Sequence, residues 1–302
     1  MEWLEYLPFV FLSWVARHLS FRQAGQVGAA LAMIAYHLPL SRKGIARENI
    51  SKSFPDLQSS QVNEIARGAF KNYGIALMEF LWCDGRSKEE LVQIIHLKDF
   101  DIVTRSLVQH RSVILLSGHF GAWELIVQGL RHPLGRPMAV IVHPLRNRRV
   151  DRIVSRIRTQ FGDRVIPMGV AVREVLKAIR EGYVIGMLGD QSGPKEAAIV
   201  DFFGRPAATH RGAAAFALKT KTPLVMVFFI RREDGTYDIQ FVEVDRTGIE
   251  SYSEEHVDEL TRRHTAILEQ YIRLRPELWL WMHKRWKHSE YFQSKQPAKE
   301  AS

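Results

Sequence analysis

Two side chains with complementary chemistry stand five positions apart in this 302-residue sequence, His119 and Glu124. They follow the apolar run Val113 to Leu116, which is typical of a buried strand, and precede the amphipathic segment Leu125 to Leu130. This context predicts that His119 lies at a strand-to-helix turn, with Glu124 about one turn into the helix. A carboxylate beside an imidazole fixes the ring tautomer and stabilises the imidazolium after proton transfer. We therefore interpret His119 as a general base and Glu124 as its orienting partner, although a pair held for packing alone would have the same spacing.

The elements that must position this pair belong to an alternating pattern that begins near residue 112. Short apolar runs are separated by helical stretches, and a long helix, Glu254 to Leu274, ends the pattern. This alternation predicts an α/β fold with a largely parallel central sheet flanked by helices. The expected strands are Val113 to Leu116, Met138 to Val142, Val184 to Leu188, Leu224 to Phe229 and Tyr237 to Val244, with helices at about 122–130, 149–160, 170–179 and 209–219.

Asp190 and Gln191 follow one of the expected strands, as His119 follows another. In open parallel sheets, ligands gather beyond the carboxyl ends of the strands. We therefore expect these polar groups on one rim of the sheet. There, Asp190 either orients a substrate or an active-site arginine, or it only forms a turn.

The first hundred residues are predicted to be helical and to contact a membrane. Tyr6 to Ala16 is uncharged and rich in aromatic residues, but its 11 residues are too few to span a bilayer. Gln23 to Ser41 is uncharged over 19 residues, yet polar and small side chains weaken it as a span. We interpret both as helices in or against the membrane surface, with a buried helical pair as the alternative. The expected parts are a helical membrane-associated portion (1–100), an α/β core (101–293) and a disordered tail (294–302).

The composition restricts the partners of the chain. A formal charge of +9 indicates an acidic partner, such as anionic lipid, nucleic acid or an acidic carrier protein. No Gly-rich phosphate loop, zinc finger or RNP-like pattern accompanies the charge, so a nucleic-acid role is disfavoured. The single cysteine, Cys83, excludes an internal disulfide and a thiolate metal cluster. A metal-dependent hydrolase using His119, Glu124, His143 and Asp190 is a rival interpretation, but no H-E-x-x-H cluster supports it.

Three further segments, taken with Ser117 to Glu124, resemble the ordered motifs of a known family. They are Val150 to Gly162, then Gly189 to Gln191 followed by Asp201 to Thr209, then Arg275 to Lys287. The set resembles the lipid A biosynthesis late acyltransferases, within the His-x4-Glu/Asp glycerolipid acyltransferase superfamily. The N-terminal half adds Arg47 to Ile50, Phe54-Pro55 and Asn72 to Glu79, so the resemblance covers roughly residues 25 to 290.

The resemblance implies transfer of an acyl chain from an acyl carrier protein thioester to a hydroxyl of a lipid A precursor. It also implies an enzyme at the cytoplasmic face of the bacterial inner membrane, peripheral or anchored by its N-terminus, with no metal or redox cofactor. Coenzyme A remains open as the donor. An acyltransferase for another glycolipid, such as a phosphatidylinositol mannoside, and a non-catalytic membrane lipid-binding protein remain open as alternative functions.

The same resemblance assigns roles to basic residues. Arg158 matches the family's arginine near the end of the expected helix 149–160, where it is expected to stabilise a phosphate or the developing oxyanion. Arg146 and Arg149 are expected to attract phosphorylated lipid or the acidic carrier, although a run of arginines is also typical of a solvated surface. Asp190 and Gln191 match an Asp-containing loop of the family, and Arg285 is expected to reach the substrate from the C-terminal motif.

A structural expectation concerns Thr209, which is expected to cap the helix that follows it.

Overall fold

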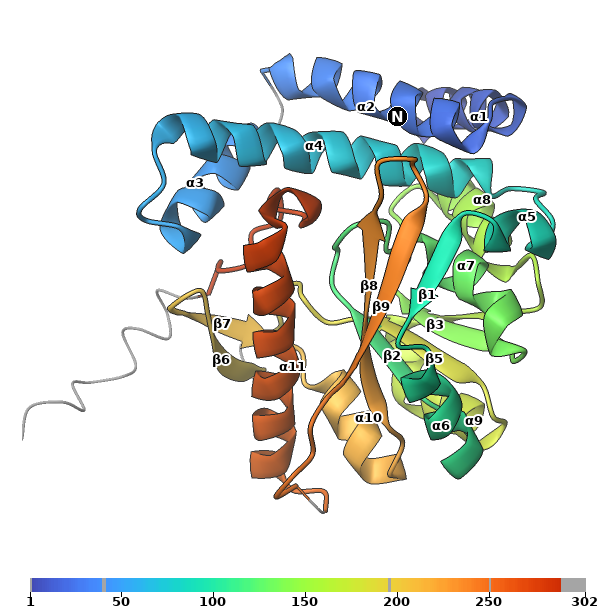
Figure 1. Cartoon of the computed structure of the whole chain (residues 1–302), viewed down its shortest axis with the longest axis vertical. Helices are drawn as coiled ribbons and strands as arrows, with labels where there is room; N and C mark the ends of the chain where they lie inside the picture. The colour runs from blue at the N-terminus through green and yellow to red at the C-terminus, as the bar shows by residue number, and fades with distance from the viewer. Residues whose placement is uncertain (1, 40–41, 195–196, 250, 289–302) are drawn as a thin grey trace, which may run out of the picture.

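A seven-stranded sheet forms the centre of the computed structural model, which describes residues 2–39, 42–194, 197–249 and 251–288 (Figure 1). The strand order is β1-β9-β8-β2-β5-β3-β4, and each neighbouring pair is parallel except β8 with β9. The predicted α/β fold with a largely parallel central sheet is therefore confirmed. The strands are β1 (Ile95–Lys98), β2 (Ile114–Ser117), β3 (Met138–Val142), β4 (Arg164–Pro167), β5 (Val184–Leu188), β8 (Leu224–Arg231) and β9 (Tyr237–Glu243).

Helices cover both faces of this sheet, because successive strand residues point to opposite sides. In β2, Ile114 and Leu116 join the core under α9, α10 and α11, whereas Leu115 joins the core under α6, α7 and α8. A strand buried on both faces needs apolar residues at every position, which explains the unbroken runs in the sequence. These helices are α6 (Asp101–Gln109), α7 (Leu125–Leu134), α8 (Arg148–Thr159), α9 (Ala171–Arg180), α10 (Gly212–Thr220) and α11 (Glu254–Leu274).

The N-terminal helices lie across the carboxyl ends of the parallel strands (Figure 1). The long helix α4 packs along α2, and their backbones touch where Gly28 faces Gly74. A Cβ atom added to Gly28 would lie 2.2 Å from the carbonyl oxygen of Gly74, so no larger residue fits there. Of the helices in the described ranges, none combines the length and apolar character that a bilayer crossing requires. The helices of this part are α1 (Glu2–His18), α2 (Phe21–His37), α3 (Lys43–Ser53), α4 (Ser59–Trp82) and α5 (Lys88–Val92).

A separate hairpin, β6 (Ala198–Phe202) and β7 (Arg205–Thr209), lies beside α11. Its turn places Phe203 at φ 58° and Gly204 at φ 69°. Thr209 is the last residue of β7, and its hydroxyl donates to the carbonyl of Ala207. The expected helix cap at Thr209 is therefore wrong, because α10 begins only at Gly212.

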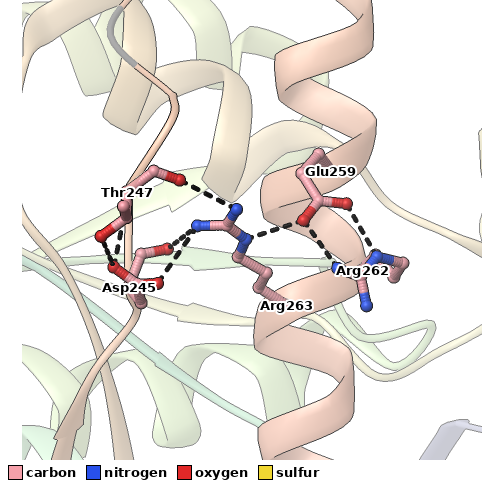
Figure 2. Close-up of polar contacts among 5 residues, drawn as sticks. All are labelled: Asp245, Thr247, Glu259, Arg262 and Arg263. Carbon is pink, nitrogen blue, oxygen red and sulfur yellow. Dashed lines mark hydrogen bonds and ion pairs between the residues drawn. The ribbon is translucent and has the colours of Figure 1, made fainter.

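Helix α11 is held by Arg263, which links it to the loop that follows β9 (Figure 2). Its guanidinium donates to the backbone carbonyls of Asp245 at 2.9 Å and Thr247 at 3.0 Å. On the helix itself, Glu259 accepts from both Arg263 and Arg262. This network fixes the helix that leads into the short 3-10 turn Pro276–Leu278 and the C-terminal segment beyond it. The expected disordered tail, 294–302, falls outside the described residues, and the division at residues 100 and 293 stays a prediction.

Candidate active site

His119 lies in a loop whose backbone conformation is fixed from two sides. The loop runs from the end of β2 to α7, and Gly121 within it adopts φ 58°. A Cβ atom at Gly121 would lie 1.8 Å from the carbonyl oxygen of Phe229 in β8, so the tight turn requires glycine. On the other side, Leu280 donates its backbone N–H to the carbonyl of His119 at 3.0 Å. The loop around His119 is thus held by contacts with β8 and with the C-terminal segment.

The partner of the His119 ring is Asp190, which follows β5. Nδ1 of His119 lies 2.7 Å from Oδ1 of Asp190, and the backbone N–H of His119 donates to Oδ2 at 2.8 Å. The two residues meet because β2 and β5 are adjacent parallel strands whose carboxyl ends share one edge. The expected position of both groups on one rim is therefore observed.

The two groups change each other's pKa. Burial alone would raise the pKa of Asp190, but the charge of His119, its ring and backbone hydrogen bonds and the indole of Trp279 lower that pKa to about 2. Burial also opposes the charged form of His119, yet the charge and hydrogen bond of Asp190 outweigh it and raise the pKa of the imidazole. The pair therefore favours a proton on His119 with Asp190 ionised.

Glu124 does not occupy the place expected for it. It is the residue directly before α7, not one turn into the helix, and its carboxylate pairs with Arg158 of α8. Nη2 of Arg158 lies 2.6 Å from Oε1, and Nε lies 3.1 Å from Oε2, a bidentate contact. The expected hydrogen bond between His119 and Glu124 is corrected accordingly: the turn directs Glu124 toward α8, and a carboxylate from the neighbouring strand occupies the position beside Nδ1.

The other ring nitrogen of His119 faces polar and aromatic side chains. In the neutral ring, with the Nδ1 proton donated to Asp190, Nε2 of His119 carries the lone pair, and Nε2 of Gln191 lies 3.2 Å from that atom. The ring packs against Trp123, with centroids 5.1 Å apart, and Trp123 stacks on Tyr73 of α4. Nε2 is therefore the atom available for proton transfer.

A groove of about 470 Å³ is lined by Gln191, the residue whose amide lies next to this nitrogen. Its walls are mainly apolar and small side chains of α1, α2 and α4, including Leu12 and Leu77. Polar groups reach it from Gln191, Arg42 and His283. An apolar groove of this size with a few polar groups fits a ligand with a hydrocarbon chain.

The other residues singled out in the sequence lie elsewhere. Arg285 is only 1% exposed, and it donates to the carbonyl of Ala208 and the hydroxyl of Thr209, both in β7. Its burial lowers its pKa to about 10, partly offset by the charge of Asp190. The expected direct contact of Arg285 with a substrate is thus corrected, because its guanidinium is enclosed by protein and does not line the groove.

Arg146 and Arg149 stand at the start of α8, beside α1. The guanidinium of Arg149 lies 4.0 Å from the ring centroid of Trp3, and Arg146 is exposed. Neither has a contact with His119 among the described residues. In those same ranges, no group of three or more His, Cys, Asp or Glu side chains is placed to hold a metal ion.

Sequence reasoning missed two residues that assemble the site. The indole of Trp279 donates to Oδ2 of Asp190 at 2.8 Å. The amide of Asn72 in α4 donates to the carbonyls of Gly121 and Leu278 at 3.3 and 3.2 Å. Asn72 was detectable as a polar residue on the apolar side of a helix, but nothing in the sequence identifies the carbonyls that it binds.

Comparison with known proteins gives a consistent result. The family model for bacterial lipid A biosynthesis acyltransferases matches residues 1–288. The lipid A biosynthesis palmitoleoyltransferase of Escherichia coli is 23% identical over 291 residues, covering 94% of this chain and 91% of that protein. The lauroyltransferase of the same organism is 23% identical over 295 residues, covering 94% and 92%. A lipid A biosynthesis acyltransferase of Haemophilus influenzae is 25% identical over 277 residues, covering 86% and 83%.

Proposed function

The chain belongs to the bacterial lipid A biosynthesis acyltransferase family, and we propose that it moves an acyl chain from a thioester to a hydroxyl of a lipid A precursor. The observation that carries this proposal is the His119–Asp190 pair, whose neighbour Gln191 lines an apolar groove. The pair supplies a general base, and the groove supplies space for a fatty acyl chain.

In the proposed reaction, Nε2 of His119 takes the proton of the acceptor hydroxyl while Nδ1–H stays bonded to Asp190. The hydroxyl oxygen attacks the thioester carbonyl and forms a tetrahedral intermediate. The C–S bond then breaks, the new ester remains on the acceptor, and the thiolate takes the proton from the imidazolium. The Gln191 amide stands next to Nε2, where it is suited to donate to the oxyanion once the acceptor has displaced it.

Arg158 is proposed to act on negative charge near this centre. Its ion pair with Glu124 holds the guanidinium in one orientation, and both side chains line a small cavity next to Trp123. We assign Glu124 the role of orienting Arg158, and Arg158 the role of stabilising the oxyanion or a phosphate of the acceptor.

The proposed donor is an acyl carrier protein thioester, with coenzyme A as the alternative. The net charge of +9 supports an acidic donor, and the arginines at the start of α8, including Arg146 and Arg149, supply a local basic surface. Substrate binding is thus proposed for Gln191 and these arginines, and no cofactor is required by the chemistry.

The proposed place of action is the cytoplasmic face of the inner membrane. Helix α1 presents exposed large apolar side chains at Trp3, Leu7, Phe11 and Trp14, and α2 presents Leu31 and Ile34. Exposed aromatic and aliphatic residues on one pair of helices support attachment to a lipid surface. The exposed Leu31 also lines the groove, as Gln191 beside His119 does, and this supports a route for a lipid acceptor from the membrane surface toward His119.

The test is transfer of a labelled acyl chain from acyl carrier protein and from coenzyme A to a panel of lipid acceptors. The panel contains lipid A precursors and phosphatidylinositol mannosides, and a His119→Ala variant runs alongside. Transfer to the lipid A precursor by the wild type alone is the expected result. Transfer by both proteins would contradict the general base, and lipid binding without transfer by either would favour the non-catalytic alternative.

A further inference from the structure

The indole of Trp279 completes the hydrogen bonding of the Asp190 carboxylate. Its Nε1–H donates to Oδ2 at 2.8 Å, and the same oxygen accepts the backbone N–H of His119 at 2.8 Å. Oδ1 is then left to the Nδ1 atom of the His119 ring at 2.7 Å. Asp190 is 4% exposed and Trp279 is 2% exposed, so water has little access to replace a lost donor.

The backbone of Trp279 is joined to the same loop that carries the histidine. Trp279 forms an isolated antiparallel bridge with Phe120, and the N–H of Gly121 donates to the carbonyl of Leu278 at 2.9 Å. The ring is enclosed by other aromatic side chains, with the Phe202 centroid 5.6 Å away. The indole therefore has one orientation relative to His119, fixed by backbone pairing and by packing.

We propose that Trp279 is a positioning residue for acyl transfer. Its indole N–H holds the Asp190 carboxylate in the orientation in which Oδ1 accepts the proton on Nδ1 of His119. Nε2 of His119 is then free to act as the base. This inference rests on the proposed function, since the base matters only if the reaction occurs. Without the indole, only the two hydrogen bonds with His119 would hold the carboxylate, whose terminal torsion has broad minima. Within the described part of the chain, His119 and Trp279 are the two residues that donate to Asp190.

Several charged groups face this pair, and the test must separate their effects from that of the indole. Glu124 and Arg158, the ion pair before α7 and on α8, act on His119 with opposite signs. Asp190 also feels the charge of the buried Arg285, and His283 lies close enough to both members of the pair to be influenced by them. None of these groups changes when only the indole N–H is removed.

The experiment compares Trp279→Phe with Trp281→Phe in the full-length protein. Trp281 is a matched control because it is also buried, at 0% exposure, and also donates its indole N–H, but to the backbone carbonyl of Pro276 at 2.7 Å. For W279F we expect kcat to fall roughly 10-fold with little change in KM, since a lost hydrogen bond to a charged group costs about that factor. A carboxylate with one donor fewer is more basic, so the acidic limb of kcat/KM should move up by roughly half a pH unit.

For W281F we expect the pH profile of the wild type. An unmoved acidic limb in W279F, or an equal shift in both variants, would overturn the proposal. If W279F does not fold, position 279 is replaced by 3-benzothienylalanine, which keeps the shape of the indole but carries sulfur in place of N–H. The same upward shift is then expected, and an unchanged profile overturns the proposal.

A measurement without turnover separates this inference from the proposed function. Labelled histidine allows the His119 ring to be titrated by NMR, with a His119→Gln variant to assign its signal. We expect a higher pKa for His119 in W279F than in the wild type, and the wild-type value in W281F. Equal His119 pKa values in all three proteins would overturn the positioning role of Trp279, whether or not an acceptor lipid is found. If the expected pKa shift appears but no acyl transfer is detected, that result counts against the proposed function only.

Discussion

Two hydrogen bonds join His119 to Asp190, one from ring Nδ1 to Oδ1 at 2.7 Å and one from the backbone N–H to Oδ2 at 2.8 Å. The carboxylate of Asp190 thus binds both the ring and the backbone of His119. These two hydrogen bonds restrict rotation of the ring and favour the tautomer with its proton on Nδ1. In this arrangement the orienting carboxylate comes from the adjacent strand. Glu124, the acid of the short motif, instead orients an arginine.

Asp190→Asn should therefore harm catalysis more than Glu124→Gln. An amide beside Nδ1 can stabilise the tautomer with its proton on Nε2, which removes the base, and such a change lowers kcat by about 10⁴ in a Ser-His-Asp enzyme. We expect D190N to lower kcat by roughly 10³ to 10⁴ and E124Q by roughly 10 to 100. Steady-state rates on one donor and acceptor pair decide this. A larger loss in E124Q than in D190N would return Glu124 to the role of orienting His119.

The pH dependence of activity follows from the raised pKa of His119. Because the base must be neutral, kcat/KM should fall as the pH drops through that pKa, which lies above the ordinary imidazole value of about 6.5. In D190N the burial of the ring is opposed only by the charge of Glu124 and no longer by Asp190, so the limb should move below that of the wild type. Rates across about pH 5 to 9 measure both limbs. Coincident limbs in the two proteins would show that Asp190 does not act on the base.

Stability should depend on pH through the same pair. The pKa of Asp190 falls to about 2 on folding, so its contribution is present above about 3.9 and is lost as pH drops toward the folded value. The pKa of His119 rises on folding, so its contribution is full below about 6.5 and is lost as pH rises through the folded value. The difference in unfolding free energy between wild type and D190N should therefore be largest near pH 5. Urea titrations at three pH values test this, and a difference independent of pH would contradict it.

The strands of this fold were predictable where they are buried on both faces. The expected bounds of β3 and β5 match those in the structure, because every position must be apolar when helices cover both sides. The edge strands β1 and β4 were missed, since polar residues such as the exposed His96 and the half-buried Arg164 break the apolar run. The β6–β7 hairpin was also missed, since the polar Asp201 interrupts the apolar residues of β6.

The position of His119 was predictable, but the carboxylate beside its ring was not. His119 is recognisable from its short motif, whereas Asp190 lies 71 positions away and becomes its neighbour only through the pairing of β2 with β5. The direction of Glu124 depends on the turn at Gly121, which is set by contacts with Phe229 and with the C-terminal segment. Such contacts between distant segments leave no periodic signal in one sequence, so spacing alone favoured the wrong pair.

The ion pair between Glu124 and Arg158 should behave as one unit in catalysis. If Glu124 acts by orienting Arg158, then E124Q, R158Q and the double variant should lose similar activity, because each removes the oriented guanidinium. A double-mutant cycle on kcat/KM measures the coupling, expected at about 1.5 to 3 kcal/mol for a partly buried charged pair. Additive losses in the double variant would mean that the two side chains act independently.

Membrane attachment through α1 gives a prediction that does not involve the chemistry. Leu7, Phe11 and Trp14 are exposed on this helix, and replacing all three by Ser should weaken binding to anionic lipid vesicles by roughly 10- to 100-fold, since each buries apolar area in the interface. Val108→Ser is a matched control, because Val108 is an exposed apolar residue on α6, apart from α1 and α2. Sedimentation with vesicles measures binding.

Salt separates the two forces expected at this surface. Arginines at the start of α8, next to α1, should add an electrostatic component that weakens as ionic strength rises, whereas the apolar component persists. The triple Ser variant should therefore retain weak, salt-sensitive binding to anionic vesicles and lose binding to zwitterionic ones. Equal loss in the Val108→Ser control, or unchanged binding in the triple variant, would assign membrane contact to another part of the chain.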